Sequence, residues 1–196
     1  MASGLHRAAG TGALPDVERF LSSGTNVDEP DERGATALHY ACLKYHLPVI
    51  RLLLAHGANP NLGNDREYTP LMAASREGMP EVVQTLLTAG ADVNKVDKER
   101  TTALIWASGY SRSLQVLEML TRAGAHIEDQ RVDGASALMW AAGAGREDNV
   151  RFLLARGARV RAMDGSGRTA LDIARERDRP GVVTLLEDAC RREPVS

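Results

Sequence analysis

The stretch "REYTPLMAASREGMPEVVQTLLTAGADVN", residues 66–94, decides the fold. It contains two short apolar segments at helical spacing, the first opened by Thr69-Pro70 and the second closed by Gly90-Ala91. Neither segment is long enough to form a stable helix alone, because isolated helices below about 12–15 residues are marginal in water. The stretch therefore predicts two short helices that are stabilised by similar units on either side.

The ends of both helices can be read from single residues. Thr69 can cap the first helix through its hydroxyl group, and Pro70 fits the first helical position, where no backbone N–H is needed. Gly78 is expected to end this helix, and Pro80 to begin the second. Gly90 then closes the second helix, since glycine readily adopts the left-handed conformation found at helix ends. The residues that follow predict an extended arm and a turn.

The same pattern recurs along nearly the whole chain. Glycines close the units at Gly24, Gly57, Gly90, Gly124 and Gly157, with steps of 33, 33, 34 and 33 residues. Leucines open the units at Leu5, Leu38, Leu71, Leu104, Leu138 and Leu171. A fixed period of this length is the signature of a solenoid, in which each unit contacts only its neighbours. The single longer step places an extra residue near 109–113, and such an insertion is often on the binding face.

These units resemble the ankyrin repeat, which carries a Thr-Pro-Leu-His-x-Ala segment, two short helices and a Gly-Ala pair leading to a β-hairpin. The segments "DERGATALHYA" (31–41), "LLLAHGANPN" (52–61) and "LLTAGADVN" (86–94) carry the resemblance, which covers about residues 5 to 188. His39 keeps the family's histidine, and His6 holds the same phase. Met72, Ile105, Met139 and Asp172 replace it in the other units.

The resemblance implies an all-α repeat solenoid, an ankyrin-type stack of helix–turn–helix–β-hairpin units. Six units are expected. They are an N-terminal capping repeat at 1–30, repeats at 31–63, 64–96, 97–130 (with the one-residue insertion) and 131–163, and a C-terminal capping repeat with a short tail at 164–196.

The charge composition limits the classes of partner. The chain has 24 Lys plus Arg and 26 Asp plus Glu, a formal net charge of −2, which argues against binding nucleic acid through phosphate contacts. Residues 1–130 carry 12 basic and 16 acidic side chains, and residues 131–196 carry 12 and 10, so the net charge changes from −4 to +2. Such a gradient could orient a partner, although a solvated surface is the simpler interpretation.

The sequence also indicates a compartment. Cys42 and Cys190 are too far apart in the array to predict a disulfide, which is typical of reduced thiols inside a cell. The start "MASGLHRAAG" has no apolar region typical of a secretory signal, and no apolar run approaches the roughly 18 residues of a membrane span. We expect a soluble monomer in the cytoplasm, with the nucleus as the alternative, and no membrane contact.

His39, Cys42 and His46 form the one group that suggests a metal. They stand at i, i+3 and i+7 along one helical face, and all three side-chain types can bind zinc. A structural zinc site needs a fourth ligand, and none is phased nearby. Separate structural roles are therefore preferred, and no cofactor is expected. A metal or small-molecule sensor built on these three residues remains the alternative function.

Signatures of catalysis are missing from the sequence. There is no G-x-S-x-G motif for a nucleophile. The segment "GAGRED" (143–148) follows a helix and lacks the Lys-Ser/Thr ending of a phosphate-binding loop. The sequence therefore predicts a protein that is not an enzyme.

Aromatic side chains gather near the first helices of the units. Trp106 and Trp140 hold the same phase in consecutive units, so their indoles should be adjacent, since neighbouring helices pack about 8–10 Å apart. Two interpretations stay open for them: a hot spot for binding, or a filling of the gap between first helices and hairpins. Tyr68 on a hairpin and Tyr110 in the inserted loop are expected to be exposed, and Tyr40 is the fifth aromatic residue of this region.

In ankyrin-like arrays, the side chains that contact partners lie on the hairpin tips and the exposed face of the first helix. We transfer these positions to the present sequence by their place in the repeat and add the aromatic residues. The predicted partner-binding residues are then Arg33, Lys44, Asp65, Arg66, Tyr68, Arg76, Glu77, Trp106, Tyr110 and Trp140. The mixture of charge and aromatic rings is typical of a polar-rimmed protein interface. The expected function is a non-catalytic module that binds a partner protein through its concave groove and hairpin tips, as adaptor, scaffold or inhibitor.

Overall fold

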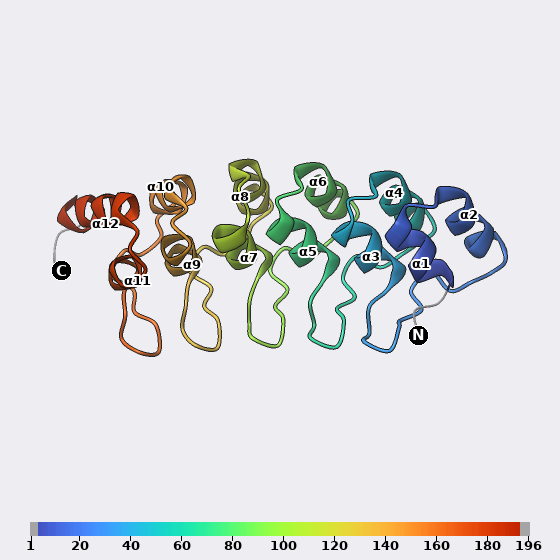
Figure 1. Cartoon of the computed structure of the whole chain (residues 1–196), viewed down its shortest axis with the longest axis horizontal. Helices are drawn as coiled ribbons and strands as arrows, with labels where there is room; N and C mark the ends of the chain where they lie inside the picture. The colour runs from blue at the N-terminus through green and yellow to red at the C-terminus, as the bar shows by residue number, and fades with distance from the viewer. Residues whose placement is uncertain (1–3, 193–196) are drawn as a thin grey trace.

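The computed structural model describes residues 4–192, and twelve helices lie within them. In chain order they are α1 (Gly4–Thr11), α2 (Leu14–Ser22), α3 (Ala37–Leu43), α4 (Leu47–Ala55), α5 (Pro70–Glu77), α6 (Pro80–Thr88), α7 (Ala103–Tyr110), α8 (Leu114–Arg122), α9 (Ala137–Gly143), α10 (Glu147–Ala155), α11 (Ala170–Glu176) and α12 (Pro180–Arg192). They pair in sequence and stack into one elongated array, with the α1–α2 pair at one end and the α11–α12 pair at the other (Figure 1). The odd-numbered helices form one row, the even-numbered helices a second, and hairpin loops project from the first row (Figure 1). The chain is thus an all-α solenoid.

The helix ends in the deciding stretch match the sequence prediction. The Thr69 hydroxyl accepts a hydrogen bond from the Met72 N–H at 3.3 Å, and Pro70 is the first residue of α5. Gly78 ends α5 in the left-handed conformation, with φ of 71°. Pro80 begins α6. The same hydroxyl cap recurs at the starts of α7, α9 and α11, so the local chemistry of one unit is repeated along the array.

The core is a continuous layer between the two rows of helices. The repeated leucines of the first five units are buried, as Leu38, Leu71 and Leu104 show, while Leu171 of the last unit is half-buried. Alanines such as Ala74 and Ala141 are buried beside them, and their small size lets neighbouring first helices approach closely. The apolar face of each helix pair is therefore covered by the next pair, which explains how helices of seven to thirteen residues are stable here.

The hairpins are joined to one another by their backbones. Four N–H groups donate to carbonyl oxygens of the preceding hairpin: Asp65 to Arg33 at 2.8 Å, Lys98 to Arg66 at 3.0 Å, Val132 to Glu99 at 3.0 Å and Gly165 to Asp133 at 2.8 Å. We call these bonds the hairpin series. Within residues 4–192, each of three hairpins is closed by a single antiparallel bridge rather than by longer strands, at Val96–Thr102, Gln130–Ser136 and Met163–Thr169. The predicted hairpin arms are present in this minimal form.

A second set of bonds joins the units behind the second helices. In each of the first four units, one side chain accepts a backbone N–H from the next unit: Asp28 from Asn59 at 3.0 Å, Asn61 from Asp92 at 2.7 Å, Asn94 from His126 at 3.1 Å and Glu128 from Arg159 at 3.0 Å. We call these bonds the turn series. The hairpin series joins the second to sixth units and the turn series joins the first to fifth, so the three inner junctions are held at two places and the first and last junctions at one.

The inserted residue changes the end of α7. The loop that follows α7 is held by the next unit: the buried Asn149 amide donates to the Ser108 and Ser111 carbonyl oxygens at 3.0 and 3.4 Å. Arg146 donates to the Gly109 and Tyr110 carbonyl oxygens at 3.4 and 3.3 Å. These bonds fix Tyr110 at the edge of the hairpin side.

Among the helices of residues 4–192, none combines the length and apolar character that crossing a bilayer demands.

Candidate partner-binding groove

Four aromatic rings meet on the hairpin side of the array, and we call Tyr68, Trp106, Tyr110 and Trp140 the aromatic cluster. The Trp106 ring is at its centre, with ring-centroid distances of 5.5 Å to Tyr68, 5.5 Å to Tyr110 and 5.4 Å to Trp140. Tyr110 and Trp140 are 5.6 Å apart. Aromatic pairs at such distances contribute about 0.5–1.5 kcal/mol each beyond the area they bury. The cluster is therefore a rigid platform built from three consecutive units.

The two tryptophans are adjacent because they hold the same phase on α7 and α9, as the sequence predicts. The Trp106 Nε1–H donates to the Asp97 carboxylate at 3.1 Å, so the ring fills the gap between its helix and its own hairpin. Both indoles are only half-buried. One part of each indole therefore fills the gap between first helix and hairpin, and the remaining part is accessible to a partner.

The two tyrosines differ in exposure. Tyr110 is 48% exposed, which confirms the prediction for the inserted loop. The prediction that Tyr68 is exposed is wrong. Its ring packs edge-on against Trp106, and its hydroxyl group is buried with no hydrogen-bond partner in the described chain. Burial also raises the pKa of Tyr68 to about 12. The reason is that Tyr68 directly precedes the Thr69 cap, at the base of the hairpin and against the next first helix.

Two arginines cover the cluster. The Arg76 guanidinium is 5.6 Å from the Trp106 centroid and 5.1 Å from that of Tyr110, and the Arg131 guanidinium is 4.8 Å from that of Trp140. A cation over an aromatic face contributes about 0.5–2 kcal/mol, more when it is desolvated. The Nε atoms of both arginines are buried without a hydrogen-bond partner among residues 4–192. The platform thus holds two cationic groups that have unused donors.

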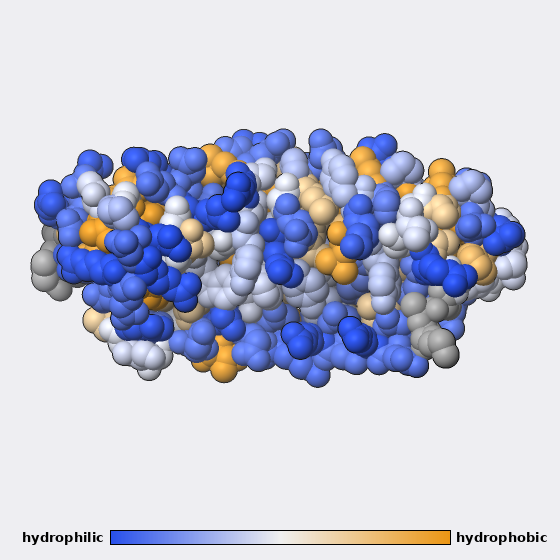
Figure 2. Space-filling model, in the orientation of Figure 1, coloured by the Kyte–Doolittle hydropathy of each residue, from blue (hydrophilic) through white to orange (hydrophobic). Residues whose placement is uncertain are grey.

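Three adjoining cavities run along this side, and together they form what we call the groove. The largest, of about 1110 Å³, is lined by Arg33, Asn64, Asp65, Arg66, Tyr68, Arg76, Asp97, Lys98, Glu99, Thr101, Trp106 and Arg131. The second is lined by Arg76, Glu77, Gly78, Tyr110, Arg112 and Ser113. The third surrounds Trp140 and also includes Tyr110 and Arg131. The surface in Figure 2 is mainly hydrophilic, with hydrophobic residues in small separate groups.

The groove brings together nine of the ten predicted partner-binding residues. Arg33, Asp65, Arg66, Tyr68, Arg76, Glu77, Trp106, Tyr110 and Trp140 line its three cavities. Lys44 is exposed and lines none of them. Whether each residue contacts a partner remains a prediction.

Some charged side chains of the groove have partners within the described chain, and others have none. Asp97 is buried and accepts from the Glu99 and Thr101 N–H groups at 2.9 and 2.8 Å as well as from Trp106, so its carboxylate serves the hairpin. By contrast, the side chains of Arg33 and Arg66 and that of Lys98 make no hydrogen bond or ion pair within residues 4–192. The groove therefore offers cationic donors to an incoming group, although the whole chain carries a net charge of −2.

Arg131 and Arg177 are among the groove residues that were not predicted from the sequence. A signal for the first was present. The position of Arg131 in its unit is held by Asp31, Asn64, Asp97 and Asp164 in the other units, so a basic residue there breaks the pattern. Arg177 occupies the phase of Glu77 and Tyr110, at the end of its first helix. Its neighbours across the groove could not be known from phase alone.

The alternative based on a metal finds no support. The His39 ring bonds to Thr36 through Nδ1 at 3.0 Å and to the Tyr68 carbonyl oxygen through Nε2 at 2.9 Å. His46 Nε2 is 3.1 Å from the Gly10 carbonyl oxygen, and the Cys42 thiol is buried. Across the described part of the chain, no group of three or more His, Cys, Asp or Glu side chains is placed to hold a metal ion.

Comparisons with known proteins agree with this architecture. A family model described as ankyrin repeats, in three copies, matches residues 5–97, 69–131 and 104–192. No curated protein matches the chain. The chain is similar to a solved structure from Bdellovibrio bacteriovorus, the predatory endopeptidase Bd0816 in complex with the immunity protein Bd3460. The TM-score is 0.87 at 26% identity, over 95% of this chain and 98% of the matched chain.

Proposed function

Because this chain belongs to the ankyrin repeat family, we propose that it binds a partner protein through the groove, with the aromatic cluster at the centre of the interface. The observation that carries the proposal is the arrangement of Arg76 over two rings of that cluster, beside cationic side chains without partners. Trp, Tyr and Arg are the residue types that dominate the energies of protein interfaces.

The stacked units support binding through their rigidity. The hairpin series and the turn series both join the three units that carry the aromatic cluster, so this part of the groove is ordered before a partner arrives. Binding to a pre-ordered surface loses less conformational entropy, and more of the contact energy then appears as affinity. An array of this kind needs no chemistry of its own, and we place the chain among non-enzymatic interaction proteins of the cytoplasm.

Inhibition of an enzyme is the role that we favour over scaffolding or adaptor functions. The support is the structural match, which contains an immunity protein in complex with an endopeptidase. The match extends over nearly the full length of both chains, so the same length of solenoid is available here. An inhibitor needs only to cover or distort the active site of its partner, which a rigid groove can do.

Affinity capture with matched variants tests the groove. The groove variant carries Arg66→Ala, Arg76→Ala and Tyr110→Ala, three residues that line the groove. The control variant carries Arg51→Ala, Arg151→Ala and Arg156→Ala, three exposed arginines of α4, α10 and the turn that follows α10. Circular dichroism first confirms that both variants are folded. A partner identified by mass spectrometry is then purified, and its affinity for each form is measured by calorimetry.

We expect the groove variant to bind at least about 100-fold more weakly, since hot-spot residues contribute about 2 kcal/mol or more each. The control variant should bind as the wild type does. Equal affinity of wild type and groove variant would refute the proposal. If the partner is an enzyme, titrating its activity with wild-type chain and groove variant tests inhibition: an unchanged activity at saturation would leave binding but remove the inhibitor role.

A further inference from the structure

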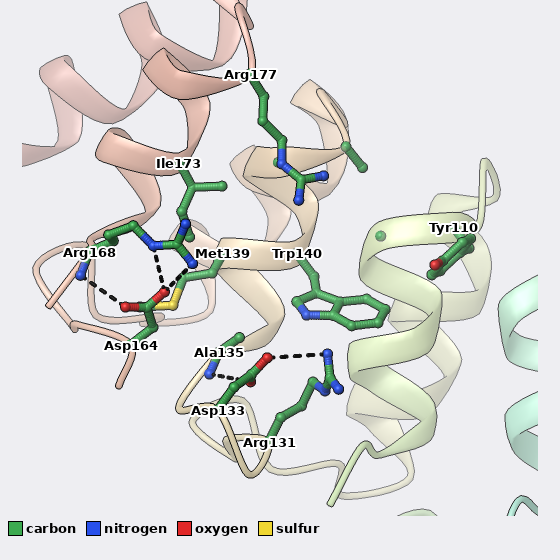
Figure 3. A pocket seen from close by; sticks show the side chains of 13 residues that line it. Tyr110, Arg131, Asp133, Ala135, Met139, Trp140, Asp164, Arg168, Ile173 and Arg177 are labelled. Atoms are coloured by element: carbon green, nitrogen blue, oxygen red, sulfur yellow. Dashed lines mark hydrogen bonds and ion pairs between the residues drawn. The ribbon is translucent and has the colours of Figure 1, made fainter. Parts of the chain in front are cut away.

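The smallest cavity of the groove surrounds Trp140 and has a volume of about 350 Å³. Figure 3 shows Arg177, which directly follows α11, and Arg131, from the hairpin before α9, pointing toward the Trp140 indole, whose nitrogen edge faces the cavity. Met139 and Ile173 close its inner side. The cavity therefore combines an apolar floor with several N–H donors.

Other units show what the Trp140 N–H lacks. In two of them, the aromatic residue at this phase donates to an aspartate nine positions earlier: the Tyr40 hydroxyl to Asp31 at 2.7 Å, and the Trp106 indole to Asp97 at 3.1 Å. In the unit of Trp140, the same position is Arg131. Among residues 4–192, the Trp140 N–H consequently donates to no acceptor.

The two arginines also have unused donors. The Arg131 side chain makes no hydrogen bond within the described chain, and its buried Nε has no partner there, while its two terminal nitrogens form long ion pairs with Asp133 at 3.5 Å and Glu99 at 3.8 Å. Arg177 makes no side-chain hydrogen bond or ion pair in that part of the chain. A planar guanidinium with free N–H groups is suited to a carboxylate, which accepts two parallel hydrogen bonds.

The acidic residues of this cavity do not supply the missing acceptor. Asp164 is buried, with one oxygen accepting from the Ser166 and Arg168 N–H groups at 2.9 Å each and the other from the Arg168 guanidinium at 2.8 Å. Asp133 accepts from the Ala135 N–H at 3.1 Å and faces Arg131. Trp140 and Arg177 thus keep donors without an acceptor among residues 4–192, Arg131 holds its two carboxylates only at ion-pair distance, and the cavity of about 350 Å³ has room for one additional carboxylate.

From these contacts we infer that the cavity around Trp140 binds the side-chain carboxylate of an aspartate or glutamate of the partner protein, held by the Trp140 Nε1–H, Arg131 and Arg177. This inference rests on the proposed function, because the carboxylate belongs to the partner. The partner residue takes the place of the aspartate that the other units carry in their own hairpins. The partner therefore presents an acidic side chain at the C-terminal part of the groove.

Titration with small probes tests the site without any partner. The chain has only two tryptophans, so its ¹⁵N-labelled form gives two indole N–H signals, and Trp140→Phe identifies the one from Trp140. The probe is N-acetyl-glutamate N-methylamide, which has one side-chain carboxylate. The matched neutral probe is N-acetyl-glutamine N-methylamide. We expect a saturable shift of the Trp140 signal with the glutamate probe alone, while the Trp106 signal, already bonded to Asp97, stays in place.

Two variants sharpen the test. Arg177→Ala should weaken probe binding about tenfold, since a hydrogen bond between charged groups is worth about 1.5–3 kcal/mol. Arg131→Asp introduces the aspartate that Asp31 and Asp97 supply in other units, so it should accept the Trp140 N–H. The Trp140 signal should then be shifted in the absence of a probe and should not change when the glutamate probe is added. No shift of the Trp140 signal, or equal shifts with both probes, would overturn the inference. Binding of N-acetylglycine in place of the glutamate probe would overturn the side-chain assignment in favour of a chain terminus.

The two experiments fail independently. A positive titration with no effect of the groove variant on partner affinity refutes the proposed function and leaves a carboxylate site without its partner. A negative titration with a strong effect of the groove variant keeps the groove as the interface and removes the carboxylate site.

Discussion

The indoles of Trp106 and Trp140 meet edge to face with their centroids 5.4 Å apart, yet among residues 4–192 only the Trp106 indole donates to a carboxylate. The two residues hold one phase of the repeat and lie on equivalent helices. Their difference comes from the hairpin, where Asp97 in one unit corresponds to Arg131 in the next. The repeat therefore places the two rings side by side, and the replacement of aspartate by Arg131 in one unit leaves the Trp140 N–H without an acceptor among residues 4–192.

Asp97 should contribute strongly to stability. Asp97→Ala removes the acceptor of two backbone N–H groups and of the Trp106 indole, so we expect the free energy of unfolding to fall by about 2–3 kcal/mol. The control is Asp65→Ala in the neighbouring hairpin, which is exposed and should change stability by less than about 0.5 kcal/mol. Urea unfolding followed by circular dichroism measures both. Equal unfolding midpoints for the two variants would contradict the role given to Asp97.

His39 should make stability depend on pH. Burial lowers the pKa of His39 below the ordinary value of 6.5, so the unfolded chain takes up a proton at a higher pH than the folded chain does. The contribution of His39 is complete above about pH 6.5 and is lost as the pH falls toward the lowered pKa. The loss amounts to about 1.4 kcal/mol for each unit by which the pKa is lowered.

The variant His39→Met isolates this effect, because Met72 and Met139 hold the same position in other units. Unfolding by urea at pH 7.5, 6.5 and 5.5 should show a decline for the wild type and a smaller decline for the variant. Asp31 and Asp172 also have lowered pKa values, but they lose their contributions below their ordinary value of 3.8. Parallel pH profiles of the two proteins would show that His39 is not the responsible group.

The two thiols should react at very different rates. Cys42 is fully buried, and burial raises the pKa of its thiol, so both access and the thiolate form are suppressed. Cys190 on α12 is only half-buried. With a disulfide reagent such as Ellman's reagent, we expect one thiol to react in the native protein and the second only after unfolding. The Cys190→Ser variant should then show no rapid phase, and a rapid phase in that variant would indicate that the first units open easily.

Alanine substitutions at Gly134 and Gly157 should differ in stability, because the two glycines have similar backbone angles but different surroundings. Both have left-handed backbones, with φ of 77° and 87°, so alanine costs about 1–2 kcal/mol of strain at either position. A Cβ at Gly134 would also lie 2.6 Å from the backbone nitrogen of Gly165, whereas a Cβ at Gly157 meets nothing within 4 Å. Gly134→Ala should therefore be less stable than Gly157→Ala by a further 1–3 kcal/mol, roughly. Thermal unfolding of both variants checks this order.

The fold could be predicted from the sequence because its determinants are local and repeated. Thr69, Pro70, Gly78 and Pro80 act on the backbone of their own unit, and each does so in the structure as its chemistry requires. The period then places equivalent units side by side without further information. Predictions of this kind need no knowledge of how distant side chains meet.

The groove could be predicted only in part, because its details depend on contacts between units. The phase of Trp106 and Trp140 was enough to place the two rings together. The burial of Tyr68 depends on the Trp106 ring of the next unit, and the sequence of one unit does not show it. Arg131 was visible as an exception to the pattern of hairpin aspartates, but its position over Trp140 follows only from the packed structure.

The hairpin series and the turn series have a mechanical consequence. Both consist of hydrogen bonds between adjacent units, so a force pulling the array apart acts on both sets at the inner junctions and on only one set at the first and last junctions. No bond in either series skips a unit. Tension should therefore peel units from the ends one after another, and the extension of the chain under load should advance in steps, each the length of one unit.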